Sequence, residues 1–407
     1  MFPASASEPL PKPRSAGAAA LVAVAILVAA YGLAQTPGTG ARQSFALLAG
    51  AGFGIVLQRG RFCFLCNLRD LFREGDPRGV LAIVVALAAG ALGYAAIFGA
   101  WLPNPFAGRL PPTAHIGPVG PALAAAAFVF GVGMSVSGSC LSAHLYRLGE
   151  GSPTSPFALV GALFGFALGF STWNAVYVAA VAEAPPGWLP SSLGYGGSLA
   201  ATMVVLVVLA VIALRFERAG ERELAASPTL RGLASAVFVR RWPFLPTGLL
   251  IGSIATLFYL RVAPLGVTTE LGSVARTASA AAGALPATLH GLDGLRGCAT
   301  AVKDTLLSDN GVFVLGLVAG SFSAALVSGA FQPKAPSVGQ VLRGLFGGVL
   351  MGWGAMTGLG CTVGVLLSGI HAGAVSGWLF LVFCVAGVLV ADRAQAALSG
   401  SRAAGPA

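Results

Sequence analysis

The sequence predicts an all-α protein that crosses a lipid bilayer about ten times. Of its residues, 56% are hydrophobic and only 9% are charged, whereas soluble globular domains carry about 25% charged residues. The apolar residues also form long continuous runs, without the alternation expected of barrel strands. Because lipid offers no hydrogen-bond partners, such runs must fold as helices.

Ten apolar runs are long enough to be membrane spans. They lie at residues 18–34, 44–58, 79–100, 120–138, 156–175, 196–215, 245–262, 311–330, 339–357 and 374–392. The first run follows Lys12 and Arg14 and therefore has features of a signal peptide. We expect it to be retained, because an uncleaved span agrees with the orientation described next.

The distribution of arginine predicts which side of the membrane each loop faces. Residues 59–78 and 215–241 are rich in arginine and should be cytoplasmic, as should residues 334–343 and the C-terminal tail. Residues 103–118 contain only Arg109, and residues 183–194 contain no lysine or arginine, so both segments should face outside. Ten alternating spans satisfy all of these assignments and leave both termini in the cytoplasm.

Two short patterns occur twice, in the same order. Residues 131–140 (GVGMSVSGSC) are similar to residues 352–361 (GWGAMTGLGC), and residues 61–72 (RFCFLCNLRDLF) to residues 296–306 (RGCATAVKDTL). The predicted orientation is opposite in the two copies, which indicates two inverted repeats with four short broken helices meeting near the centre. The predicted organisation is an N-terminal tail and first span, a first repeat, a cytoplasmic loop, a second repeat and a C-terminal tail, at residues 1–43, 44–215, 216–244, 245–393 and 394–407.

The glycine breaks that precede Cys140 and Cys361 indicate anion binding. A broken membrane helix exposes backbone N–H groups, and a helix N-terminus attracts negative charge. A neutral thiol there can donate a weak hydrogen bond. Arg296 and Lys303 fall on the predicted outer side, where the positive-inside rule does not explain them, so we expect them to attract an anion. Glu270 and Asp304 are their candidate partners.

These motifs resemble those of the YeeE/YedE family, also called the sulfur-transport domain family. The similar segments are GIVLQRGRFC at 54–63, GMSVSGSC at 133–140, PLGVTTELG at 264–272 and GLGCTVGVLLSGI at 358–370. The resemblance implies uptake of thiosulfate or a related sulfur compound across the bacterial inner membrane by a multi-pass protein. It implies a central path lined by Cys63, Cys140 and Cys361, and a TusA-like cytoplasmic sulfur carrier as partner. The internal repeat adds Cys298 to this set.

Other functions remain as alternatives or are disfavoured by the residues. The same path would suit selenium or other sulfur species, and Cys63 with Cys66 forms a C-x-x-C pattern typical of thiol-disulfide oxidoreductases. His144 could pair with Cys140 at a metal, but no further ligands accompany them, so we expect no metal or other cofactor. Without a nucleotide-binding loop or a soluble nucleic-acid module, we expect a transporter, neither an enzyme nor a nucleic-acid-binding protein. Cys384 lies in an apolar run and should only pack.

The predicted orientation can be tested by labelling from outside the cell. A cysteine introduced at Ser191 should react with a membrane-impermeant thiol reagent, and one introduced at Ala225 should not, because the arginine distribution places them on opposite sides. The opposite pattern would overturn the orientation and, with it, the inverted-repeat hypothesis.

Overall fold

The fold is entirely helical in the part of the chain that the computed structural model describes, residues 13–218, 230–294, 300–303, 305 and 307–403. Nine helices in these ranges are long and apolar enough to cross a membrane. A tenth span consists of two helical pieces, at 338–357 and 362–371, that meet at an angle of 42°. Because each of the ten predicted apolar runs coincides with one of these spans, the prediction of about ten spans is confirmed.

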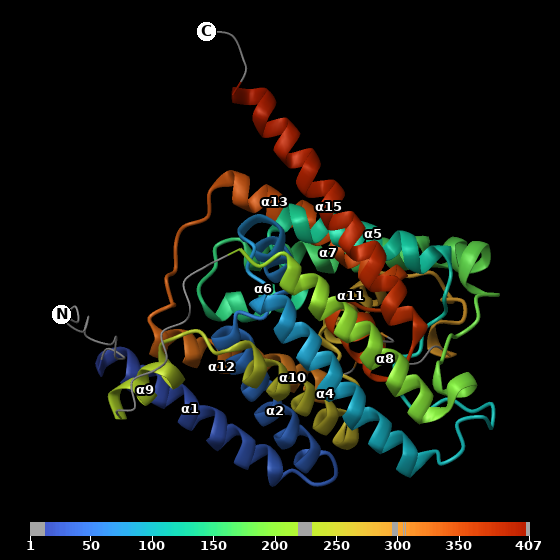
Figure 1. The fold of residues 1–407 in the computed structure, drawn as a ribbon, viewed down its shortest axis with the longest axis horizontal. Coiled ribbons are helices and arrows are strands. Elements are labelled where there is room, and N and C mark those ends of the chain that lie inside the picture. Colours follow the sequence, from blue (N-terminus) through green and yellow to red (C-terminus); the bar gives the residue numbers. More distant parts are fainter. Residues whose placement is uncertain (1–12, 219–229, 295–299, 304, 306, 404–407) are drawn as a thin grey trace.

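The long helices run side by side, with α6 and α11 among them and the short helix α9 at the edge of the molecule (Figure 1). The long helices are α1 (Pro13–Ala34), α2 (Gly40–Gly60), α4 (Arg78–Trp101), α5 (Pro121–Ser137), α7 (Ser155–Val176), α8 (Pro190–Arg215), α10 (Phe244–Arg261), α12 (Asp309–Ser328), α13 (Val338–Thr357) and α15 (Val375–Ala403). The short elements are α3 (Phe64–Arg69), η1 (Asp70–Glu74), α6 (Leu141–Gly149), η2 (Tyr177–Val181), α9 (Leu230–Phe238), α11 (Val267–Ala281), η3 (Leu292–Gly294), η4 (Thr362–Ser368) and α14 (Gly369–His371).

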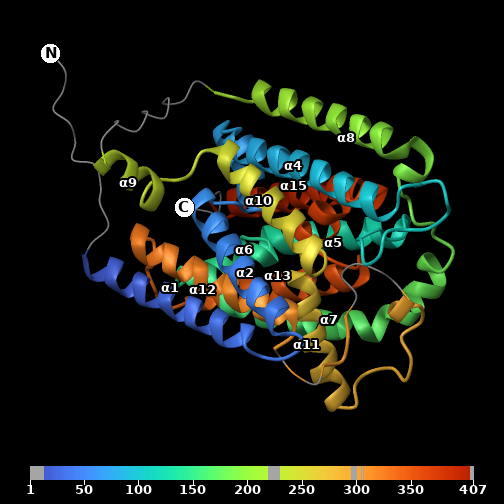
Figure 2. The same ribbon diagram turned by 90° about the horizontal axis from the view of Figure 1, so that it is seen from below.

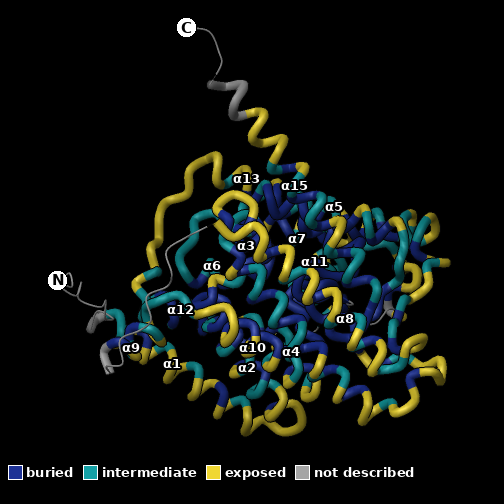
Figure 3. Tube along the Cα trace, in the orientation of Figure 1, coloured by how far each residue is buried: buried dark blue, intermediate teal, exposed yellow. Residues whose placement is uncertain are grey.

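Helices far apart in sequence form the main packing pairs. In the first group of helices, α2 packs on α12 and α10 packs on α4. In the second group, α13 packs on both α5 and α7, and α15 packs on α5. Helices α1 and α8 lie along opposite edges of the bundle (Figure 2) and are its least buried spans. The buried residues are concentrated between these edges (Figure 3).

Helix α1 is integrated into this bundle. It packs against α2 and α12, and Ser323 Oγ donates a hydrogen bond to the carbonyl of Ala19 at 3.2 Å. Helix α1 therefore contacts two other spans of the bundle.

Glycine allows two of the helix pairs to approach backbone to backbone. A Cβ added to Gly54 of α2 would collide with the carbonyl oxygen of Leu317 on α12, and one added to Gly320 would collide with that of Ala51. The α7–α13 pair is built in the same way, with Gly165 against Val349. Small residues at such interfaces are how membrane helices gain packing energy where lipid removes the hydrophobic driving force. The many glycines of the sequence therefore serve close helix packing.

The loops gather in two sets that agree with alternating spans. Among the segments predicted to be outside, Val119 N donates to Pro185 O at 3.0 Å. Among those predicted to be inside, Trp242 N donates to Arg59 O at 2.9 Å and Gln332 N donates to Glu150 O at 3.1 Å. Segments assigned to one side of the membrane by charge thus lie together.

The glycine contacts predict a matched pair of stability effects. Gly54→Ala should lower the stability of the detergent-solubilised protein by about 1–3 kcal/mol, the usual cost of overpacking, because the helices must move apart. Gly339→Ala, where nothing lies within 4 Å of an added Cβ, should be neutral or slightly stabilising. Equal unfolding midpoints for the two variants in thermal unfolding would contradict the packing described here.

Candidate functional site

Three cysteines stand at the N-caps of helices that begin inside the bundle. Cys63 precedes α3, Cys140 precedes α6 and Cys361 precedes η4, and all three side chains are buried. The break before Cys140 is made by Gly138, which ends α5 in the left-handed conformation at φ 87°. Helix starts at Cys140 and Cys361 were expected from their glycine breaks, whereas Cys63 was placed on the path by the family resemblance. Cys298, its fourth cysteine, and Arg296 lie outside the described residues.

The structure brings Cys63 and Cys140 together. The Cys63 sulfur lies 3.6 Å from Ser139 Oγ, the hydroxyl of the residue directly before Cys140. The Cys140 sulfur lies 3.3 Å from Ser142 Oγ. Thiols and hydroxyls are thus the polar groups at this junction of two helix N-termini, and both can donate weak or moderate hydrogen bonds to an anion.

The third break, at Cys361, is held open by a histidine from the predicted outer loop. Leu359 adopts a left-handed conformation with φ 58°, which is uncommon for a side chain with a Cβ. Its carbonyl oxygen lies 2.8 Å from His115 Nε2. Burial lowers the pKa of His115, so the ring is neutral and Nε2–H donates to this carbonyl. At the other side of the break, Val363 N donates to the Cys361 sulfur at 3.4 Å.

A small cavity beside this break contains two hydroxyls that lack hydrogen-bond partners. It is lined by Phe166, Thr268, Leu292, Thr300, Ala355, Met356, Leu359 and Gly360. Thr268 Oγ1, near the start of α11, and Thr300 Oγ1 are both buried, and neither has a partner within the described parts of the chain. An unpaired buried hydroxyl costs roughly 1–3 kcal/mol. The cavity measures about 10 Å³, room for about one water molecule, so the two hydroxyls can bond a water there.

Lys303 lies near this cavity but is already paired. Its Nζ forms an ion pair with Glu270 and donates to Ser308 Oγ at 2.6 Å. The sequence analysis named Glu270 as a candidate partner for Lys303, and this pairing is confirmed. Since the carboxylate offsets the ammonium charge, attraction of an anion by Lys303 stays a prediction. Asp304, the other candidate partner, lies outside the described residues.

Two residues weighed from the sequence have structural roles. Both ring nitrogens of His144 lie 3.1 Å from serine hydroxyls, those of Ser137 and Ser155, so the ring is fully bonded. Within the described ranges no group of three or more His, Cys, Asp or Glu side chains could hold a metal ion. Cys384 is fully buried in α15.

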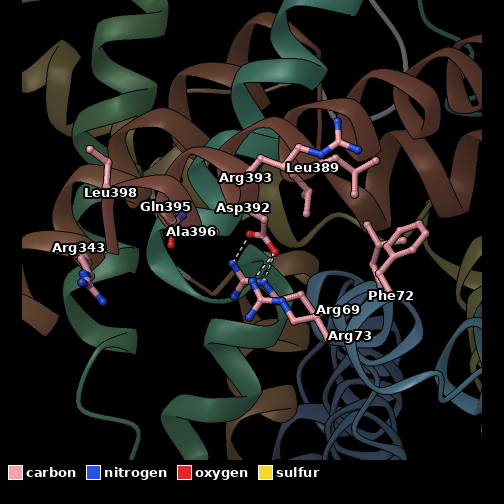
Figure 4. Close-up of a pocket in the computed structure, with 12 residues that line it drawn as sticks. Arg69, Phe72, Arg73, Arg343, Leu389, Asp392, Arg393, Gln395, Ala396 and Leu398 are labelled. Carbon is pink, nitrogen blue, oxygen red and sulfur yellow. Dashed lines mark hydrogen bonds and ion pairs between the residues drawn. The ribbon is translucent and has the colours of Figure 1, made fainter. Parts of the chain in front are cut away.

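A spacious cavity of the structure does not include any of these cysteines in its lining. It measures about 970 Å³ and lies between the segment 68–73 and the end of α15 (Figure 4). Asp392 accepts hydrogen bonds from Arg69 Nε at 3.0 Å and Arg73 Nη2 at 2.9 Å. These ion pairs tie the helix that follows Cys63 to α15, while Arg343 and Arg393 are exposed at the rim.

Comparison with known proteins assigns this arrangement to a family. A family model described as sulphur transport matches residues 59–390, which include all three buried cysteine breaks. The chain belongs to the sulphur transport family.

Two relatives in this family align over most of their own length. The thiosulfate transporter TsuA of Escherichia coli K12 is 28% identical over 85% of this chain and 92% of its own length. The protein of the same name from Spirochaeta thermophila is 31% identical, over 84% of this chain and 95% of its own length. The probable transporter YedE of Salmonella typhimurium is 24% identical over 45% of this chain and 43% of its own length. The family resemblance of the motifs is thus confirmed.

Proposed function

We propose that this chain carries thiosulfate, or a closely related small sulfur anion, across the bacterial inner membrane along a path past Cys361, Cys140 and Cys63. The observation that carries the proposal is the burial of three cysteines at helix N-termini inside a membrane bundle. Its similarity over most of its length to two proteins named thiosulfate transporters supports the choice of substrate.

The physical reason for this construction is the cost of the anion's charge in lipid. A charged side chain at the bilayer centre costs at least about 2.5–3.5 kcal/mol, and a multiply charged anion must overcome a comparable barrier. Helix N-termini provide fixed positive ends, and thiols add weak donors, so each break forms a shallow site. Shallow sites in series let an ion enter and also leave, which a single tight site would prevent.

The inverted repeat, which we propose on the basis of the helix packing, relates these sites. In this repeat, the first-half helices α2, α4, α5 and α7 correspond, in that order, to the second-half helices α10, α12, α13 and α15. The packed pair α2–α12 then has its counterpart in α10–α4, and the packed pair α5–α15 has its counterpart in α13–α7. The break at Cys140 then corresponds to the break at Cys361. Helix α3, which begins after Cys63, corresponds to α11. Thr268, near the start of α11, therefore occupies the position that corresponds to the start of α3. The packing favours this alignment over the one from motif similarity, which paired Cys63 with Cys298.

We further propose that the thiols act without forming a covalent bond to the substrate. A persulfide route would require a thiolate, which would repel an approaching anion, and would leave sulfite behind. A neutral thiol donates to the anion and releases it unchanged. No enzymatic turnover or cofactor is part of this proposal. A TusA-like carrier on the cytoplasmic side would then receive the sulfur compound.

Two alternatives use the same residues. Selenium or another sulfur species would follow the same path, and competition with thiosulfate uptake would reveal it. A thiol-disulfide oxidoreductase built on Cys63 and Cys66 has some support, because Cys63 is the N-cap of α3 and Cys66 lies in the first turn of the same helix. That activity requires Cys66, whereas transport does not, so loss of function in Cys66→Ala without loss of protein would favour the oxidoreductase.

Uptake of thiosulfate labelled separately on its two sulfur atoms tests the transport proposal. Cells that depend on this chain to grow on thiosulfate should accumulate both labels together. Cys361→Ala should abolish uptake because the donor is lost, while Cys361→Ser and Cys140→Ser should keep partial activity since a hydroxyl also donates. Cys384→Ala, which removes a packed thiol, should be nearly neutral. Full uptake by Cys361→Ala, or entry of only the outer sulfur, would contradict the mechanism.

The unpartnered hydroxyls give a second prediction. Thr268→Val and Thr300→Val should each reduce uptake several-fold while leaving thermal stability unchanged or raised, because the lost hydroxyls bond nothing in the described protein. Thr247→Val is the matched control. Its buried hydroxyl donates to Pro243 O at 2.8 Å within α10, so it should lose some stability and keep uptake. Normal uptake by both Thr268→Val and Thr300→Val would remove these hydroxyls from the path.

A further inference from the structure

A second cavity opens beyond the Cys63–Cys140 pair, on the predicted cytoplasmic side. It measures about 600 Å³, and the charged and thiol side chains on its wall are those of Arg61, Cys66, Asp70, Arg147, Glu150 and Lys334. We call it the inner basin. Cys66 lies on its wall, in the first turn of the helix that begins directly after Cys63. The inner basin therefore lies next to the Cys63 helix start.

Arg147, near the end of α6, is a cation without a carboxylate partner within the described residues. Its Nη2 donates to the Cys66 sulfur at 3.2 Å. Of the acids on the basin wall, Glu150 accepts at Oε1 from Gln58 Nε2 at 3.2 Å, and burial raises the pKa of Glu150 although the nearby charge of Arg147 opposes this rise. Asp70 is the remaining acid. A half-buried guanidinium whose acceptor is a sulfur atom retains most of its capacity to bind an anion.

We propose that Arg147 is the anion-binding residue at the inner mouth of the path, where it takes the substrate oxyanion from the Cys63–Cys140 pair. This inference rests on the proposed function and assigns a residue and a ligand chemistry to the inner end of the path. A guanidinium presents paired donors that match two oxygens of a sulfonate-like group. Because sulfur is a weak acceptor, an oxyanion can replace Cys66 on Arg147. The charge of Arg147 would also select anions over neutral solutes.

Cys66 provides a local reporter for this site in the full-length protein. In inside-out membrane vesicles, Cys66 should react faster with an anionic methanethiosulfonate reagent than with a cationic one of similar size, and thiosulfate should slow the reaction. The labelling that is lost in Cys66→Ser is the part that belongs to Cys66. In Arg147→Gln the anionic-to-cationic rate ratio should fall at least about fivefold, and protection by thiosulfate should be lost. Arg147→Lys should preserve the ratio but weaken protection, because the paired donors are absent.

Lys334→Gln is the matched control, because it removes the same charge from an exposed position on the rim of the basin. It should change the rate ratio less than about twofold, since solvent screens an exposed charge. A variant whose Cys66 reacts with a neutral maleimide as fast as in the unmodified protein has an intact basin. If Arg147→Gln fails this check, the test rests on how strongly thiosulfate protects Cys66 in Arg147→Lys. An unchanged ratio and unchanged protection in Arg147→Gln, or full protection in Arg147→Lys, would overturn the role of Arg147. Neither outcome affects the proposed function, which fails only if the unmodified protein takes up no thiosulfate.

Discussion

Unpaired backbone N–H groups inside a membrane are the constraint around which this structure is organised. A helix that starts within the bundle leaves its first N–H groups without partners inside the helix, and lipid cannot supply them. Here helices start inside the bundle at Cys63, Cys140 and Cys361. Such starts are tolerated in a membrane where they face protein or bind something. The breaks are therefore the natural place for a polar substrate.

The rest of the fold supports these breaks. Close backbone contacts at glycine hold α2 to α12 and α7 to α13, so the interrupted spans lie between tightly packed helix pairs. Side chains from distant segments then fix the break geometry. His115 bonds the carbonyl of Leu359, and the ion pairs of Asp392 tie the helix after Cys63 to α15. These contacts hold the segments around Cys63 and Cys361 in place.

The sequence revealed the spans and the cysteine breaks because both leave a signal in local composition. Ten continuous apolar runs correspond to ten spans, and a glycine-rich end followed by cysteine correctly indicated an N-cap at Cys140 and Cys361. Helix α11 left no comparable signal, since Thr268, Glu270 and Ser273 make it too polar to look like a membrane segment. Its burial is decided by the helices around it, mainly α7 and α12.

The groups that surround the cysteines were harder to find. His115, Thr300 and Arg147 belong to no periodic pattern, and their contacts span large distances in the chain, as the 244 residues between His115 and Leu359 illustrate. The pairing of Lys303 with Glu270 could be predicted from the sequence, because a charged residue is unusual in each of their apolar surroundings. Arg147 gave a similar hint, as a cation within a short segment after Cys140, but its contact with Cys66 depends on how α3 and α6 meet.

The proposed transport mechanism requires that the substrate anion occupy the helix breaks. Selenosulfate replaces the outer sulfur of thiosulfate with selenium, so a crystal soaked with it can be examined at the selenium absorption edge. The account predicts anomalous peaks next to the N-termini at Cys140 and Cys361, with no continuous density joining selenium to a cysteine sulfur. Peaks confined to the arginine-rich cavity of Figure 4, or a selenium atom bonded to a cysteine, would contradict it.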